Sequence, residues 1–290
     1  MYKIFKIRTL FLIIGFGVIS IFCFLTFFSG INQNTVSVAA EENEIRLPII
    51  MYHGILNDTK YQGDYVISPV QFENDLKKLL SESYTTVTVS DLVDYVYKDK
   101  ALPQKPIMLT FDDGYYNNYL YAYPLLKKYG CKAVLSPIAY YSDYFSETDE
   151  KVSASYFHCS WQQLSEMIQS GNVEVQNHSY NMHTEHGRLG LRRKQNEDNS
   201  AYEKLITDDI QTAQKIITDN LSVTPQAFVY PFGEFNDTTE KVIKRLSFRC
   251  SMICEEKVNV ITKDKESLYK LGRFIRTDKM SSDEIFAKFE

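Results

Sequence analysis

The chain has 290 residues, a net charge of −5 at pH 7, and apolar and charged fractions of 44% and 24%. These fractions are typical of a globular protein. The acidic balance lacks the basic footprint of a nucleic-acid-binding protein, so we expect no nucleic-acid partner.

The first 45 residues are expected to precede the folded domain. Basic residues in 1–8 are followed by an apolar run over 9–29. About twenty apolar residues span a bilayer, and flanking positive charge keeps that side in the cytoplasm. We therefore expect a cytoplasmic N-terminus at 1–8, a transmembrane anchor at 9–29, a polar linker at 30–45 and an extracytoplasmic domain at 46–290. The alternative is a secretory signal with a cleavage site in the small residues at 37–40, which would make the protein secreted.

Strand-like and helix-like segments alternate along the domain. Strand-length runs of apolar or β-branched residues are expected at 47–52, 85–89, 106–111, 132–138, 173–176, 227–230, 249–253 and 268–275. Helices are expected after the caps Ser68, Ser90 and Ser160, over 119–129 and 202–220, from Asp237, and after Ser281 or Ser282. Residues 140–158 are expected to form an inserted loop.

This alternation predicts parallel strands with helices outside them. Because no glycine-rich phosphate loop is present, we predict an α/β fold of the distorted (β/α)7-barrel type, preceded by one N-terminal hydrophobic helix. In such barrels the chemistry gathers at the carboxyl ends of the strands.

Four cysteines follow the apolar run, so disulfides are possible in an exposed compartment: Cys131, Cys159, Cys250 and Cys254.

Polar residues follow several predicted strands at the point where each strand ends. Asp112 and Asp113 lie in the stretch Thr110–Gly114, directly after an apolar run. Such an Asp-Asp-Gly is by itself typical of a turn. However, His53, His178 and Tyr230 also follow predicted strands, and this coincidence favours a site over scattered turns.

His178 and His183 add two imidazoles to the strand-end carboxylates. On a helix their spacing would turn them about 140° apart, so we place His183 on a loop or first helical turn that folds back toward His178. Two histidines and one aspartate leave open positions for water and substrate, as a hydrolytic metal requires. We expect a divalent metal, zinc, although cobalt, nickel or iron would also bind such a set.

The stretch Thr110–Gly114, followed by His178-Ser179 and a second histidine, resembles the NodB-type polysaccharide deacetylases, which are carbohydrate esterase family 4. The likeness extends over nearly the whole domain. Residues 47–53 resemble the opening of the poly-N-acetylglucosamine de-N-acetylase-like branch. In that branch the strand order is circularly permuted, so a catalytic histidine comes early in the domain.

The resemblance implies a role for each residue. Asp113, His178 and His183 match the metal ligands, and Asp112 matches the general base that takes a proton from the attacking water. His53 matches the general acid that protonates the leaving amine. Tyr230 begins the counterpart of the third motif, where its backbone N–H would face the developing oxyanion.

Two departures from the family pattern matter. The common spacing between the two histidines is one residue shorter, but the longer spacing occurs in the named branch, so we prefer His183 to His186 as the ligand. The third motif usually begins with an arginine that supports the base, and Ala227 and Phe228 stand there instead. Either Arg273 takes that role, or Arg273 is a surface strand residue and the base is less well supported.

The sequence thus predicts a metal-dependent hydrolase that removes acetyl groups from N-acetylated sugars of a cell-wall or extracellular polysaccharide. Two alternatives stay open. One is a catalytically silent glycan-binding domain on the same barrel, and the other is an esterase acting on O-acetylated xylan or peptidoglycan.

Overall fold

Short parallel strands surrounded by helices form the centre of the structure, a computed structural model that describes residues 44–148 and 153–289. The strands are β1 (Ile45–Leu47), β2 (Ile49–Tyr52), β3 (Gly54–Ile55), β4 (Val66–Ile67), β5 (Thr85–Thr86), β6 (Pro106–Asp113), β7 (Ala133–Pro137), β8 (Val173–Val175), β9 (Ala227–Val229), β10 (Cys250–Met252), β11 (Asn259–Ile261) and β12 (Phe274–Ile275). The α-helices are α2 (Pro69–Ser81), α3 (Val89–Lys98), α4 (Tyr123–Tyr129), α5 (Ala139–Glu147), α6 (Trp161–Gln169), α7 (Asn199–Leu221), α8 (Asp237–Arg245) and α9 (Ser282–Ala287).

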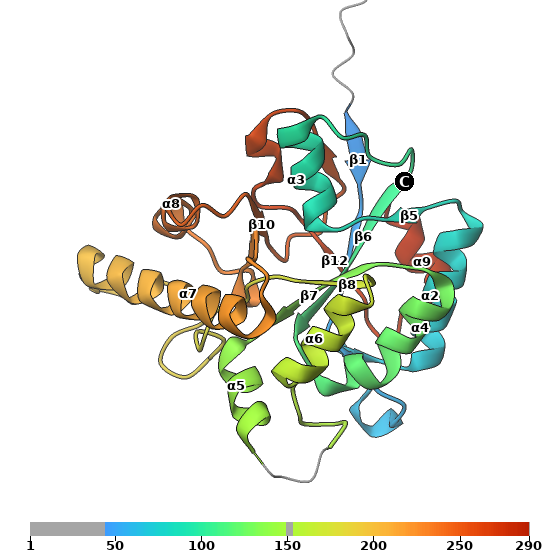
Figure 1. Cartoon of the computed structure of the whole chain (residues 1–290), viewed down its shortest axis with the longest axis horizontal. Coiled ribbons are helices and arrows are strands. Elements are labelled where there is room, and N and C mark those ends of the chain that lie inside the picture. The colour runs from blue at the N-terminus through green and yellow to red at the C-terminus, as the bar shows by residue number, and fades with distance from the viewer. Residues whose placement is uncertain (1–43, 149–152, 290) are drawn as a thin grey trace, which may run out of the picture. The chain divides into compact units, whose positions relative to one another are not determined.

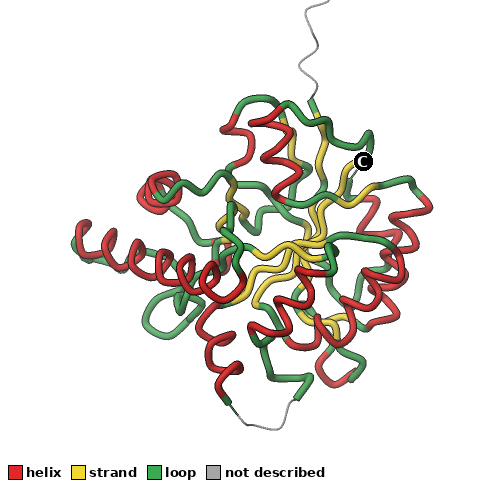
Figure 2. Tube along the Cα trace, viewed as in Figure 1, coloured by secondary structure: helices red, strands yellow, loops and turns green. Residues whose placement is uncertain are grey.

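Within the described residues, seven parallel strands close into a ring. Five of them pair in the order β12-β2-β6-β7-β8, and β9 pairs with β10. Single bridges complete the ring, Asn177 to Phe228 between β8 and β9, and Met252 to Leu271 between β10 and the segment before β12. The strands lie at the centre of Figure 2 and the helices around them. The strand–helix alternation is therefore confirmed, and the two single-bridge joins are where the ring is distorted.

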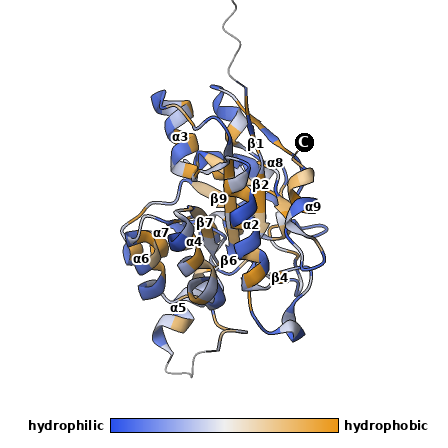
Figure 3. Ribbon diagram, turned by 90° about the vertical axis from the view of Figure 1, so that its right-hand side faces the viewer, coloured by the Kyte–Doolittle hydropathy of each residue, from blue (hydrophilic) through white to orange (hydrophobic). Residues whose placement is uncertain are grey.

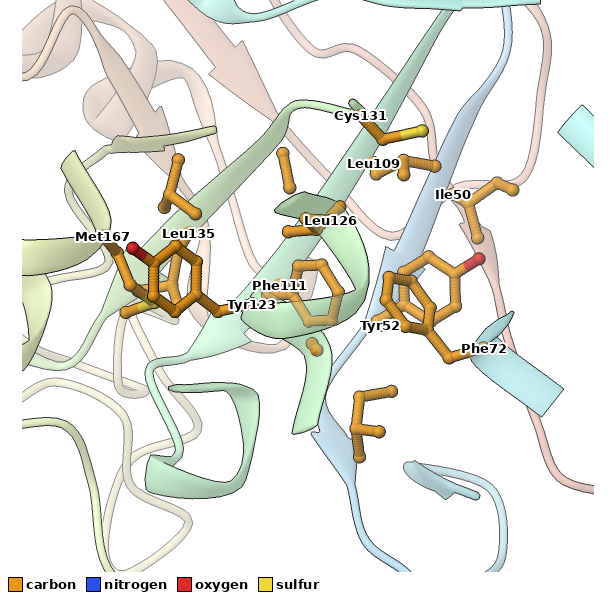
Figure 4. Close-up of a cluster of buried hydrophobic side chains, with 14 of the residues drawn as sticks. Ile50, Tyr52, Phe72, Leu109, Phe111, Tyr123, Leu126, Cys131, Leu135 and Met167 are labelled. Carbon is orange, nitrogen blue, oxygen red and sulfur yellow. The ribbon is translucent and has the colours of Figure 1, made fainter. Parts of the chain in front are cut away.

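The two faces of the strands pack into different clusters, as the alternation of side chains along a strand requires. Ile50, Leu109 and Leu135 face the outer helices, where they join Phe72 of α2 and Met167 of α6. The alternate residues of the same strands belong to a second cluster: Ile49, Met108 and Val134. The ribbon in Figure 3 is accordingly most hydrophobic along the central strands.

The interior of the ring changes from apolar to polar along β6. Met108 belongs to the apolar interior, and the next two residues on the same face are Thr110 and Asp112. Both contact the buried guanidinium of Arg273. The polar groups therefore gather at the carboxyl end of the strands, which is where the predicted site lies.

The predicted helix starts are mostly confirmed by cap geometry. Ser68, Ser160 and Ser281 each cap a helix and form a capping box with the third helical residue. The second helix differs, because Thr88 rather than Ser90 is its cap. The Thr88 side chain accepts from the backbone N–H of Asp91, and the Asp91 carboxylate accepts from the backbone N–H of Thr88.

Two expected segments were wrong, and one expected helix is confirmed with a wider first turn. The predicted loop at 140–158 begins with helix α5, which is held by tertiary contacts because the indole N–H of Trp161 donates to Asp143 at 2.8 Å. The helix expected over 119–129 begins with a wider π turn at Asn118–Ala122. Residues 268–275 are strand only at Phe274–Ile275, since a 3-10 turn occupies Lys265–Leu268.

The predicted segments at 1–8 and 9–29, and all of the linker except its last two residues, lie outside the described residues. At the linker's end, Ile45 already begins β1, so the folded part starts slightly earlier than expected. None of the helices in the described residues is long and apolar enough to span a membrane. The four cysteines are free, so the disulfides considered above are absent from the described part of the chain.

A buried ion pair ties the end of the chain to α2. Asp75 is 1% exposed and accepts from Nε of Arg276 at 2.8 Å and from its second terminal nitrogen at 3.1 Å. The hydroxyls of Ser282 and Tyr52 donate to the same carboxylate at 2.6 and 3.1 Å. One carboxylate thereby joins α2, β2, the segment after β12, and α9.

We expect Asp75→Ala to lower the free energy of unfolding by about 3–5 kcal/mol, because it leaves the guanidinium of Arg276 buried without a counter-charge. Urea denaturation followed by circular dichroism measures the change. The matched control is Asp208→Ala, which breaks the exposed pair with Lys204 on α7 and should change stability by less than about 1 kcal/mol. Equal effects of the two substitutions would contradict the role given to Asp75.

Candidate active site

Asp112 and Asp113 end β6 but lie in different surroundings. Asp112 continues the strand, and its side chain points into the ring toward Arg273. Asp113 has a left-handed backbone (φ 66°), which turns its side chain in a different direction. Gly114 follows at φ 74°, and a Cβ there would lie 2.8 Å from Cβ of Pro137. Glycine is therefore required by both conformation and space, and the Asp-Asp-Gly turn separates the two carboxylates.

Asp113, His178 and His183 converge on one point. Nε2 of His178 lies 3.5 Å and Nε2 of His183 lies 3.2 Å from Oδ1 of Asp113. The three candidate ligand atoms all lie within 4.8 Å of one another. His178 follows β8, and His183 lies on the loop that folds back toward it, as expected from the sequence. The structure thus brings together the three residues predicted as metal ligands.

The backbone fixes the orientation of His178. Its Nδ1 lies 2.8 Å from the carbonyl oxygen of Val229, to which it donates when Nδ1 carries the proton. That tautomer leaves the lone pair of Nε2 facing Asp113. Asn177 holds the turn by accepting from the backbone N–H of Ser179 and donating to the carbonyl of Ile210. A metal-binding histidine is typically oriented in this way, by a hydrogen bond from its other ring nitrogen to a backbone carbonyl.

The cluster has the chemistry of a cation site. Oδ1 of Asp113 is buried and has no hydrogen-bond partner, although two imidazole nitrogens lie close to it. Burial alone would raise the pKa of Asp113, but His178, His183 and His53 outweigh it and lower that pKa. Burial lowers the pKa of His183 to about 4, so its ring is neutral at pH 7, as a ligand must be. These donors therefore fit a divalent metal.

Asp112 is held by Arg273 through two hydrogen bonds of 2.7 and 2.8 Å. Both side chains are buried, and Nε of Arg273 also donates to the carbonyl of Ile253 at 3.0 Å. Burial by itself would raise the pKa of Asp112, but the adjacent guanidinium outweighs it and keeps that pKa below its usual value. Of the two alternatives left open by the sequence, the structure selects the one in which Arg273 supports this carboxylate.

His53 follows β2 at the same end of the ring. Burial lowers its pKa, and the charges of Asp113 and Asp112 oppose that effect. Its Nδ1 is buried and has no hydrogen-bond partner in the described structure. The ring of Tyr65 lies edge-on to it, with the centroids 5.0 Å apart. His53 is therefore a neutral imidazole before substrate binds, and it lies close enough to both aspartates for their charges to raise its pKa.

The structure does not match the expectation for Tyr230. Its backbone N–H donates to the carbonyl of Met252 at 3.0 Å, so it is used by the pairing of β9 with β10 and does not face the site. Its hydroxyl donates to Glu240 at 2.5 Å on the outside of the ring. The motif follows β9, as expected, but the backbone N–H of Tyr230 is not the donor that faces the site. Phe232, two residues on, is the residue of this turn that reaches the site, with its ring 4.3 Å from that of His183.

The structure adds an aromatic wall beside Asp113 that we did not predict. The ring of His158 stacks on Tyr141 at 4.4 Å and lies 4.8 Å from Tyr115. Tyr115 follows Gly114 directly, and burial together with the charge of Asp113 raises its pKa. Its position next to the Asp-Asp-Gly turn was the available signal. His186, the alternative ligand, lies exposed on the loop.

Known proteins are similar to this chain in sequence and in fold. The family described as polysaccharide deacetylase matches residues 99–251. The "Putative polysaccharide deacetylase YxkH" of Bacillus subtilis (strain 168) is 29% identical over 214 residues, which cover 74% of this chain and 66% of that protein. A poly-beta-1,6-N-acetyl-D-glucosamine N-deacetylase of Staphylococcus aureus (strain MRSA252) is 29% identical over 205 residues, 69% of this chain and 65% of that protein.

Among solved structures, a de-N-acetylase from Aggregatibacter actinomycetemcomitans is 25% identical, with a TM-score of 0.72, covering 84% of this chain and 100% of that chain. The chain spans just under two thirds of the length of the two curated relatives above. The family match itself extends over more than half of the chain and contains Asp112, Asp113, His178 and His183. The chain therefore belongs to the polysaccharide deacetylase family.

Proposed function

We propose that this protein is a metal-dependent hydrolase that removes acetyl groups from N-acetylated glucosamine units of a cell-wall or extracellular polysaccharide. The observation that carries the proposal is the convergence of Asp113, His178 and His183 next to the ion pair of Asp112 with Arg273. One carboxylate is thereby available to a cation and the other to a proton. The names of the curated relatives favour poly-β-1,6-N-acetylglucosamine as the substrate.

Asp113, His178 and His183 would hold the ion, and their two imidazoles and one carboxylate favour zinc. When bound, a divalent ion at such a site supplies Lewis-acid polarisation of the acetyl carbonyl and makes water a better nucleophile. The chain's own residues perform the proton transfers. Asp112 stays ionised because Arg273 neutralises its charge, and it accepts a proton from the attacking water.

His53 gives a proton to the nitrogen that leaves as an amine. An amide needs this step, because without a proton the nitrogen would have to leave as a strongly basic amide anion. Because burial lowers the pKa of His53, its ring starts neutral, and the proton that it delivers to the nitrogen is the one that Asp112 has removed from the attacking water. Its place beside both aspartates is compatible with that exchange.

The proposal includes location and attachment. The apolar run at 9–29 supports a membrane anchor, with the domain outside the cytoplasm, or secretion if that segment is cleaved. A polysaccharide substrate outside the cell suits either form.

Acetate release is the first test. We expect the purified protein to release acetate from β-1,6-linked N-acetylglucosamine oligomers, to lose the activity with a chelator, and to regain it with zinc. Parallel assays on O-acetylated xylan and peptidoglycan fragments test the alternative, since an esterase would release acetate from these substrates and not from the N-acetylated oligomers. Measurable oligomer binding with metal present but no acetate from any of these substrates would instead identify a silent glycan-binding domain.

The metal centre makes a prediction of its own. We expect His183→Ala to weaken zinc binding by more than about 100-fold, because even the loss of an outer-shell partner costs about 10–100-fold. Zinc titration calorimetry and the metal content of the purified protein measure this loss. The matched control is His186→Ala, three residues along the same loop, which should bind zinc like the wild type. Loss of zinc in the control alone would reverse the ligand assignment.

The role of His53 predicts a dependence on the leaving group. We expect His53→Ala to lower kcat on N-acetylglucosamine oligomers by about 10²–10⁴-fold, the usual contribution of general acid–base catalysis. Hydrolysis of an aryl acetate should change little, since an aryl oxide leaves without a proton. Zinc content should stay at the wild-type level. An equal loss on amide and aryl ester would contradict the assignment of His53 as the acid.

A further inference from the structure

Tyr65 combines high exposure with a contact to the site. It is 61% exposed, yet its ring lies edge-on to that of His53, with the centroids 5.0 Å apart and the planes at 74°. A tyrosine so exposed contributes little to the core. A large ring held in solvent beside a half-buried site histidine is instead placed to contact a ligand.

The backbone under Tyr65 is well held. The carbonyl of Tyr65 accepts from the N–H of Gly54 at 2.9 Å, where β3 pairs with β4. The buried Asn117 accepts from the N–H of Ile55 and donates to the carbonyl of Ala154, each at 3.0 Å. Tyr65 is therefore presented from a fixed backbone, which reduces the entropy that a ligand contact would cost.

The aromatic surface continues beyond Tyr65. The hydroxyls of Tyr61 and Tyr156 lie 2.6 Å apart, and Tyr156 is 64% exposed. This contact joins the loop between β3 and β4 to the segment before α6, and the two lie side by side at the lower edge of Figure 1. Because Tyr61 and Tyr65 lie on the same short segment between β3 and β4, Tyr156 extends the aromatic surface of the segment that contacts His53.

The chemistry of the proposed reaction decides what lies on that side. The acetyl group must face the cluster of Asp113, His178 and His183, and the nitrogen must face His53. Because the nitrogen leaves attached to the sugar, the sugar ring lies on the side of His53. Pyranoses have an apolar face of C–H groups, and tyrosine offers a rigid, amphipathic surface for such contacts.

We propose that Tyr65 is a substrate-contacting residue that packs against the pyranose carrying the leaving nitrogen, and that Tyr61 and Tyr156 extend this surface to the next sugar. The inference rests on the proposed function and adds to it a sugar-binding position. Tyr65 then contributes to the affinity for glycan and has no part in binding the acetyl group.

The test measures binding apart from turnover. In zinc-loaded protein carrying Asp112→Asn, calorimetry measures Kd for short β-1,6-linked N-acetylglucosamine oligomers and for acetate. We expect Tyr65→Ala to raise Kd for the oligomers about tenfold, which corresponds to about 1.4 kcal/mol, and to leave Kd for acetate unchanged. Tyr65→Phe keeps the ring and should bind like the parent. Leu205→Ala removes a similarly exposed apolar side chain, 44% exposed on α7, and should have no effect.

Two outcomes would overturn the inference while leaving the proposed function intact. The first is an unchanged Kd for the oligomers in Tyr65→Ala. The second is a raised Kd that Tyr65→Phe shares with Tyr65→Ala, which would assign the effect to the hydroxyl and not to ring packing; a lower kcat with unchanged Kd would belong to the first outcome and mean that Tyr65 only holds His53 in place. If the wild-type enzyme releases no acetate from any glycan and Asp112→Asn binds none, the proposed function fails, and this inference fails with it.

Discussion

The ion pair between Asp112 and Arg273 is the constraint on which the site depends. A guanidinium with 0% exposure in the interior of a small barrel is costly unless every donor has a partner. Arg273 meets this condition with Asp112, Thr110, the carbonyl of Ile253 and the sulfur of Cys254. The pair fixes Asp112 in the interior and keeps it ionised. The left-handed turn that follows is then free to direct Asp113 toward the two imidazoles.

This arrangement divides one Asp-Asp pair between two kinds of chemistry. Asp112 has its charge balanced by a permanent cation, whereas Asp113 has an oxygen with no hydrogen-bond partner. Two adjacent carboxylates with identical surroundings would repel each other and share a proton. Here the backbone at Asp113 and Gly114 separates them, and a carboxylate for a cation lies beside a carboxylate for a proton.

Much of this could be predicted from the sequence, for identifiable reasons. Strand-end polar residues and helix caps are local signals, so the alternation of strands and helices, most caps and the cluster of Asp113, His178 and His183 were expected. The partner of Asp112 was left open, because Arg273 lies 161 residues away and is brought there only by closure of the ring. The Tyr230 N–H was misassigned because strand pairing with Met252, a tertiary contact, already uses it. Helix α5 was missed because contacts with the distant Trp161 hold it.

The join between β8 and β9 holds one of the two histidines and not the other. A single bridge closes the ring there, and the bond of His178 to the carbonyl of Val229 crosses the same gap. His178 is thus part of the barrel wall, at 1% exposure, whereas the His183 side chain is 19% exposed and arrives from a loop. The His178 imidazole thus adds a side-chain bond to a join that the backbone bonds of Asn177 with Ala227 and Val229 already make. His183 takes no part in this join, so its loop can move while the ring of strands stays closed. Such a movement would change one ligand of a bound ion and leave Asp113 and His178 in place.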